Sequence, residues 1–229
     1  MDPVTLSDDR LILRPMRPSD AGHVLAGWQD ETVRRWTEVP AEPTLRQARA
    51  FVEVVCAQGW QDATNLIFAA ELKRTGEFVG SLGVFGLSWA GLSEQLAWVG
   101  YWTAAGQRGR GHTSAALRMM SAWAFGALGV DRLEAVVEVG NDASLACAER
   151  AGYVLEGTHR ARTVQNGSRR DAWVAALLPQ DLDRPSSVPY PCAAPGPPHP
   201  AGQWPARTGP AAGTVGDGRP ATGAVRLPG

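Results

Sequence analysis

Hydrophobic and polar positions divide the first 183 residues into alternating strand-like and helix-like stretches. Short runs of apolar and β-branched residues predict strands, whereas apolar residues spaced three or four positions apart predict helices. The predicted helices begin near residues 19, 44, 112 and 141, and residues 30–43 are predicted to be irregular. The predicted strands are residues 10–14, 65–72, 78–87, 95–103, 133–139, 153–158 and 171–178.

Local signals mark several of these boundaries. Ser19 is the predicted N-cap of the first helix, and Thr44–Gln47 reads as a capping box. Gly152 is the predicted left-handed C-cap of the last helix. The predicted hairpin turns lie at residues 73–76, 89–93 and 166–167.

The order of these elements predicts an α/β fold, a mixed sheet covered by helices on both faces. We assign residues 1–183 to one domain. Residues 184–229 hold 11 of the 17 prolines and 8 of the 26 glycines, with almost no large aliphatic side chains. Such a segment cannot bury enough apolar surface to offset the entropy of ordering it, so we predict a disordered tail.

One stretch, Gln107–Ala116, joins a predicted strand to a predicted helix through a glycine-rich turn. Gly109 and Gly111 lack Cβ atoms, so the turn can adopt positive φ and bring backbone N–H groups close to a ligand. The N–H groups of the helix's first turn have no intrahelical partners, and phosphates bind such places readily. The stretch reads either as a phosphate site or as an ordinary strand-to-helix turn.

The residues of this stretch fit three known phosphate-binding motifs to different degrees. The P-loop pattern GxxxxGK[ST] fits Gly106–Thr113 except that His112 replaces the lysine that contacts the phosphates, and Lys73 is the one lysine in the chain. The dinucleotide fingerprint GxGxxG fails because Ser114 occupies its last glycine position. The pyrophosphate-loop pattern (Q/R)xxGx(G/A) fits Arg108–Thr113, with Thr113 in the last small position.

Sequence blocks on both sides of the loop resemble one family. Three blocks of the chain read VGYWTAAGQRGRGHTSAALRMMSAWAF, RLEAVVEVGNDASLACAERAGYVLEG and DAWVAALL. In both order and spacing, these blocks resemble the GNAT acetyltransferases of the RimJ/RimL type, which are ribosomal-protein-alanine N-acetyltransferases. The resemblance covers about residues 8–183. It implies a GNAT-like fold with a splayed central sheet, acetyl-CoA as the acetyl donor and a primary amine as the acceptor.

The same resemblance implies roles for named residues. Backbone groups of Tyr101, Trp102 and Thr103 would pair with the pantetheine arm of acetyl-CoA. In the N-x-A-S motif, Asn141 would contact that arm and the Ser144 hydroxyl would lie near the sulfur, although either residue could instead be an N-cap. The residues expected to hold the diphosphate are Arg108, Gly109, Arg110, Gly111, His112, Thr113 and Ser114.

The sequence does not identify a general base. Trp98 occupies a position where the family often has an acid, which would change the wall beside the reacting amine. Glu134 and Glu138 share one face of their strand, and Glu138 could reach the cleft, but we expect both at the surface. A bound amine with a lowered pKa, or a water relay, would make a base unnecessary. Trp36 is either a lid over the acceptor entrance or a core anchor.

Composition and charge narrow the remaining possibilities. The net charge is −1, and residues 1–183 carry 18 basic and 22 acidic residues, so we expect no nucleic-acid partner. No apolar run approaches the roughly 18 residues needed to span a bilayer, and we expect a cytoplasmic protein that is a monomer or a homodimer. Cys56, Cys147 and Cys192 are expected to be reduced thiols, and no metal site is predicted.

The sequence features bear on three classes of function. The favoured one is acetyl-CoA-dependent N-acetylation of a protein N-terminal α-amine, with a small antibiotic or metabolite amine as the alternative acceptor. A non-catalytic acyl-CoA-binding module is the second class, and the N-x-A-S motif argues against it. A nucleotide hydrolase is nearly excluded because the P-loop lysine is absent.

Overall fold

The computed structural model describes residues 1–87, 95–165 and 167–188 of the 229. Its helices are α1 (Ala21–Gln29), α2 (Glu31–Trp36), α3 (Leu45–Ala50), α4 (Ala57–Gln61), α6 (His112–Ala127) and α7 (Asp142–Ala151). Its strands are β1 (Leu6–Ser7), β2 (Leu11–Pro15), β3 (Leu66–Leu72), β4 (Phe78–Phe85), β5 (Leu96–Thr103), β6 (Arg132–Glu138), β7 (Val154–Gln165) and β8 (Ser168–Leu177). Short 3-10 turns cover Pro18–Asp20, Ala105–Gln107 and Pro179–Leu182, and a π-helical segment, Phe51–Cys56, joins α3 to α4.

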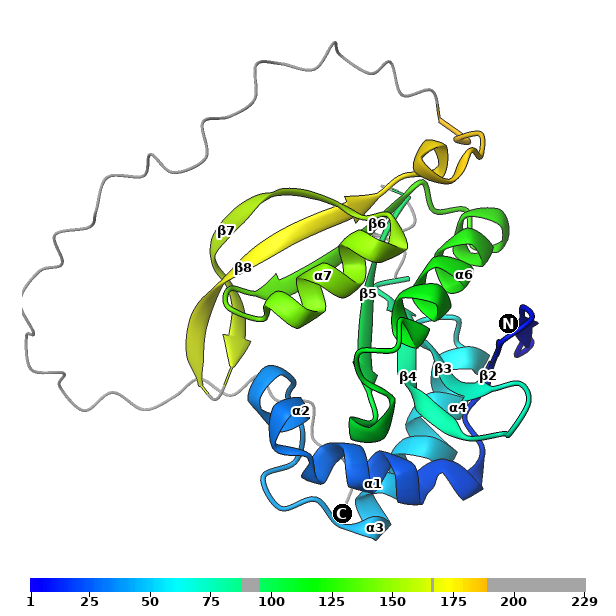
Figure 1. The fold of residues 1–229 in the computed structure, drawn as a ribbon, viewed down its shortest axis with the longest axis vertical. Helices are drawn as coiled ribbons and strands as arrows, with labels where there is room; N and C mark the ends of the chain where they lie inside the picture. Colours follow the sequence, from blue (N-terminus) through cyan, green and yellow to red (C-terminus); the bar gives the residue numbers. More distant parts are fainter. Residues whose placement is uncertain (88–94, 166, 189–229) are drawn as a thin grey trace, which may run out of the picture. The chain divides into compact units, whose positions relative to one another are not determined.

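The eight strands form one sheet in the order β1-β2-β3-β4-β5-β6-β8-β7. Every neighbouring pair is antiparallel except β5 and β6, which run parallel. These two strands pair only where Leu96–Val99 meets Arg132–Ala135. Beyond that point β5 stays paired with β4 and β6 stays paired with β8, so the two strands separate (Figure 1). The predicted splayed, mixed sheet is confirmed.

Helices cover both faces of this sheet, as predicted. Neighbouring residues of a strand point to opposite faces. Tyr101 contacts Ser144 of α7 on one face, whereas on the other face the ring of Trp102 lies where a Cβ on Gly27 of α1 would be. The main core lies under α6 and contains Phe68, Leu117 and Met120, and a smaller cluster joins α1 to the α3 region.

Two predictions about the N-terminal half were wrong, and one predicted helix is two residues longer than expected. Residues 30–43 contain α2, whose N-cap is Asp30, with its Oδ1 accepting a hydrogen bond from the Val33 N–H. Ser19 does not cap a helix, because the Asp20 carboxylate accepts the Arg17 N–H instead. The helix predicted over residues 44–59 continues to Gln61 through the π-helical segment.

The last two strands are longer than predicted. β7 runs to Gln165 and β8 begins at Ser168, so both extend past the end of β6 as a two-stranded ribbon. Described structure also continues to Val188, five residues beyond the predicted domain end at Asp183. The Asp131 carboxylate accepts hydrogen bonds from Ser187 and Val188 there.

The predicted hairpin over Trp89–Ser93 and residues 189–229 of the predicted tail lie outside the described residues. Among the helices that the structure describes, none has the length and apolar character that crossing a bilayer requires.

Candidate active site

The separation of β5 from β6 opens a cleft of about 730 Å³. Its floor is made by the diverging strands, at Val99–Thr103 and Ala135–Glu138. One side is formed by the glycine-rich loop and the start of α6, and another by α7. Residues of α2 line the cleft as well, so elements from the whole domain meet here.

The glycine-rich loop has the backbone that its sequence predicts. Gly109 and Gly111 have φ of 73° and 75°, a left-handed conformation that other residues rarely adopt, and Gly111 is the N-cap of α6. Apart from the chain neighbours of each glycine, no heavy atom of the described residues lies within 4 Å of where a Cβ would be at Gly109 or Gly111. Backbone N–H groups of the first turn of α6 are therefore approachable from the cleft, and His112, Thr113 and Ser114 all line it.

The two loop arginines differ in position. Arg108 lines the cleft, and its guanidinium contacts Asp30 at 2.6 Å and the carbonyl oxygen of Thr103 at 3.2 Å. Burial by itself would raise the pKa of Asp30, but the hydrogen bonds from Arg108 and Val33 outweigh it and lower that pKa. Arg110, which was predicted to bind the diphosphate, does not line the cleft.

Two polar atoms in the cleft wall have no hydrogen-bond partner among the described residues. They are Oε1 of Gln107, a residue that is 3% exposed, and Nδ1 of His112. Burial, followed by the nearby positive charges of Arg10 and Arg110, lowers the pKa of His112. Buried polar groups are normally satisfied, so these two atoms indicate that a polar ligand completes this end of the cleft. Gln107 was not among the predicted site residues.

The predicted catalytic pair, Asn141 and Ser144, lies at the N-terminus of α7 in the cleft wall. Asn141 Oδ1 accepts the Ser144 N–H at 3.2 Å, so its side chain is the N-cap of α7. Ser144 Oγ donates to the Tyr101 hydroxyl at 3.2 Å, and that hydroxyl donates to the Ser144 carbonyl oxygen at 2.8 Å. Burial raises the pKa of Tyr101, so the phenol stays protonated.

Glu138 lies at the end of β6, beside the start of α7, and its carbonyl oxygen accepts the Asn141 N–H at 3.1 Å. Its side chain is 10% exposed and accepts a 3.2 Å hydrogen bond from Arg35 of α2. The expectation that Glu138 and Glu134 are surface residues was wrong, since Glu134 is also largely buried and pairs with Arg132. Their even spacing placed both on one face, but only the structure shows that α2 covers the end of β6.

The structure also gives the positions of Trp36, Cys147 and Trp98, which the sequence left open or predicted differently. Trp36 lines the cleft beside Glu138, with the Arg35 guanidinium 4.1 Å from its ring centre, so it is a wall of the entrance rather than a core anchor. Cys147 of α7 also lines the cleft, and burial raises the pKa of its thiol to about 11. Trp98 does not line the cleft and is 43% exposed, so it cannot change the wall beside a reacting group.

Comparison with known proteins identifies the family. Residues 10–154 match the model of the acetyltransferase (GNAT) domain. The chain belongs to the GNAT acetyltransferase family. It is 27% identical over 173 residues to the uncharacterized N-acetyltransferase YoaA of Bacillus subtilis, a match covering 76% of this chain and 96% of YoaA.

Solved structures share the GNAT fold. RimJ of Mycobacterium smegmatis in complex with CoA-disulfide has a TM-score of 0.70 and 24% identity, covering 80% of this chain and 93% of RimJ. RimL, a ribosomal L7/L12 alpha-N-protein acetyltransferase in complex with coenzyme A, has a TM-score of 0.66 and 20% identity, covering 76% of this chain and 98% of RimL. Below 25% identity, these likenesses show the fold alone.

As a GNAT enzyme, this chain is an N-acetyltransferase and acetyl-CoA is its acyl donor. The cleft fits such a donor at its loop end, where a diphosphate would find approachable backbone N–H groups and the unpartnered His112. The metal-binding residue types, His, Cys, Asp and Glu, form no cluster suited to an ion within the described ranges.

Proposed function

We propose that this GNAT enzyme acetylates the N-terminal α-amine of a protein. One observation carries the proposal: a second hollow lies next to the cleft. This hollow, of about 590 Å³, lies along α2 and shares Thr32, Trp36 and Thr37 with the wall of the cleft. An extended polypeptide can use a second hollow beyond its reacting amine, whereas a small amine does not need one.

The proposed roles in donor binding follow from the cleft's two ends. Gly109, Gly111 and the first turn of α6 would hold the diphosphate, with Arg108 beside them. The edge of β5 from Tyr101 to Thr103, free of β6, would pair with the pantetheine arm. Bound acetyl-CoA supplies a thioester whose carbonyl carbon accepts the amine nitrogen. A backbone N–H on this edge would stabilise the negative charge that develops on the carbonyl oxygen.

The proposed proton transfers use one side chain at the end of β6 and one on α7. Glu138 would take a proton from the attacking ammonium group, directly or through water, and Arg35 would hold the carboxylate in place. As the C–N bond forms and the C–S bond breaks, the Ser144 hydroxyl would give hydrogen-bonding support or a proton to the departing sulfur. Tyr101 would position Ser144, since its hydroxyl contacts Ser144 Oγ. The proton that the nitrogen loses after the C–N bond forms would replace the one that Ser144 gives to the sulfur.

The test is a screen of acetyl-CoA turnover against peptides with free N-termini and against amine metabolites and aminoglycosides. Release of the free CoA thiol reports turnover, and mass spectrometry reports which nitrogen carries the acetyl group. We expect peptides to be acetylated at the α-nitrogen, and the same peptides with a blocked N-terminus to be inert. Turnover of small amines with no turnover of any peptide or folded protein would overturn the proposal in favour of a small-molecule acceptor.

A further inference from the structure

The β7–β8 ribbon has an unusual charge distribution. β6 ends at Glu138, whose register partner on β8 is Ala172. Residues 160–165 and 167–171 of the ribbon extend beyond this pair, and we call this part the distal ribbon. It carries Arg160, Arg162, Arg169 and Arg170 and one acidic residue, Asp171, whereas the rest of residues 1–183 holds 14 basic and 21 acidic residues. The positive charge of a mildly acidic domain is therefore concentrated here.

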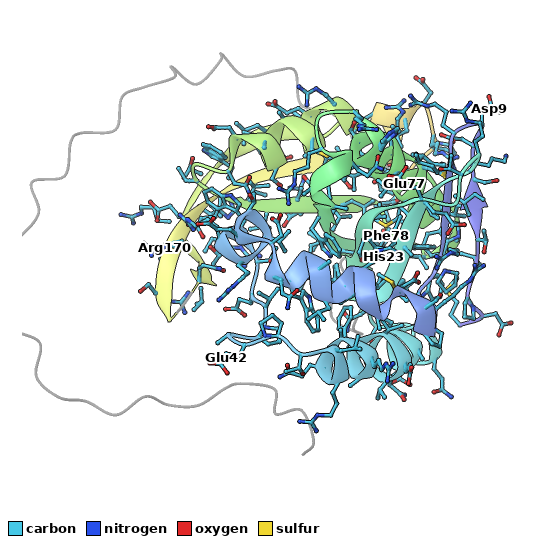
Figure 2. The ribbon with its side chains drawn as sticks, turned by 60° about the horizontal axis from the view of Figure 1, so that its bottom comes forward. Asp9, His23, Glu42, Glu77, Phe78 and Arg170 are labelled. Carbon is cyan, nitrogen blue, oxygen red and sulfur yellow. The ribbon has the colours of Figure 1, made fainter. Side chains whose placement is uncertain are left out.

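These arginines are exposed and are not neutralised locally. None of the four takes part in an ion pair within the described part of the chain. Arg169 donates to the carbonyl oxygen of Ala161, which leaves its charge uncompensated. The nearest acid, Asp171, accepts the Ala161 N–H through its carboxylate. Figure 2 shows Arg170 at the edge of the molecule, on the yellow ribbon.

The distal ribbon also borders the acceptor side of the cleft. Gln165 reaches the backbone carbonyl oxygens of Arg34, Arg35 and Thr37 at 3.3–3.5 Å, so the ribbon packs against α2. Arg170 pairs with Thr163, which points to the same face as Gln165, two residues away along β7. Arg170 thus lies on the face of the ribbon that packs against α2, the helix that lines both hollows, whereas Arg169 pairs with Val164 and points to the other face.

The strand register gives the spacing from the cleft. Arg170 is two residues from Ala172, the partner of Glu138, which corresponds to roughly 7 Å along β8. An extended peptide covers a similar distance in two residues. With its first residue at Glu138, its third residue would lie near Arg170.

We propose that the acceptor is an acidic polypeptide, recognised through a carboxylate at about its third residue by Arg170, while the other arginines of the distal ribbon add positive charge nearby. This proposal rests on the proposed acetylation of protein N-termini and names the class of protein. Oppositely charged partners associate faster and select one another, and exposed arginines bind carboxylates in this way.

The experiment measures acetylation of three peptides that share their first two residues and differ at positions three to five. One carries Asp and Glu there, one carries Asn and Gln, and one carries Lys. The enzymes are the full chain, its Arg169→Gln/Arg170→Gln variant and, as a matched control, its Arg46→Gln/Arg49→Gln variant. The control arginines are exposed on α3, outside both hollows and outside the ion pairs of the described residues.

With the full chain, we expect the acidic peptide to have the lowest KM of the three peptides. This KM should rise about 3- to 10-fold in the Arg169/Arg170 variant and should not change in the control variant. The preference should weaken as salt increases, and KM for acetyl-CoA should stay unchanged. Equal KM values for acidic and neutral peptides would overturn this inference while leaving the proposed function intact. A raised KM for acetyl-CoA would reassign the arginines to the cofactor.

A single-stranded RNA oligomer provides another test. If RNA inhibits the full chain but not the Arg169/Arg170 variant, and acidic peptides are not preferred, the distal ribbon is a nucleic-acid surface and the inference is overturned. If no peptide of any charge is acetylated while small amines are, the proposed function fails and this inference fails with it. The four outcomes are distinguishable on the same three enzymes.

Discussion

At the scale of single residues, the two polar side chains of the N-x-A-S motif do different work. Asn141 provides the cap of α7 through Oδ1, whereas the Ser144 side chain faces the Tyr101 hydroxyl and caps nothing. The sequence alone allowed either residue to be the cap. The distinction depends on which side chain the fold turns toward β5, and this is information that the local sequence does not contain.

This difference yields a paired prediction. Ser144→Ala should keep the melting temperature and lower kcat by about 10²-fold or less, because proton transfer typically contributes 10²–10⁴-fold and a thiol leaves readily. Asn141→Ala should lose about 1 kcal/mol of stability as the cap is removed. Thermal unfolding and steady-state kinetics on both variants check this. A Ser144→Ala enzyme with normal kcat and a lowered melting temperature would remove Ser144 from the chemistry.

A second prediction concerns Glu138. If its carboxylate takes the amine proton, Glu138→Gln should lower kcat by about 10²–10⁴-fold while KM for acetyl-CoA stays unchanged. Glu134→Gln is the matched control, since Glu134 lies on the same strand face but pairs with Arg132 and does not line the cleft. Equal effects of the two substitutions would point to a structural role for both carboxylates.

At the scale of elements, glycine and capping signals were the most predictable features. The positive φ of Gly109, Gly111 and Gly152 follows from residue type and position alone. The short helix α2 was missed because its six residues carry no periodic apolar stripe, and packing against the cleft and the ribbon stabilises it instead. The ribbon was missed for a similar reason, since both of its faces are largely polar and exposed.

The loop gives a prediction at this scale. Gly111→Val should weaken acetyl-CoA affinity severely, because a β-branched residue disfavours φ near 75° and its side chain would occupy the approach to the α6 N-terminus. Gly106→Val is the matched control, because Gly106 lies in the same region with open space around it and without positive φ. Calorimetry with both folded variants measures the effect. Unchanged affinity in Gly111→Val would exclude this loop as the diphosphate site.

At the scale of the whole molecule, the order of elements, the mixed sheet and its separation point agree with the expectation drawn from the family resemblance. The end of the domain was harder to place, because composition changes gradually after Asp183. Ser187 and Val188 are held by the side chain of Asp131, more than fifty residues earlier. Such a long-range contact leaves no signal in the composition of the segment itself.

Truncation tests this boundary. A chain ending at Val188 should keep its melting temperature and turnover, because every described contact is retained. A chain ending at Asp183 loses the hydrogen bonds to Asp131 and should be destabilised by about 1 kcal/mol. Asp131→Ala in the full chain should reproduce that loss. Equal stability of the two truncated chains would show that residues 184–188 contribute nothing measurable.

The parting of β5 from β6 has one more consequence, in the isotope exchange of the backbone. From Gly100 to Thr103, β5 has a hydrogen-bonding neighbour on the β4 side only, so alternate amides on its other edge face the cleft without a strand partner. In deuterated water these amides should exchange rapidly although they lie in the middle of the sheet. Addition of CoA should slow them to the rate of a paired strand, while the cleft-remote amides of β3 keep their rate. The bound CoA would then occupy the free edge of β5 in the way that a ninth strand would, and its release would expose that edge again.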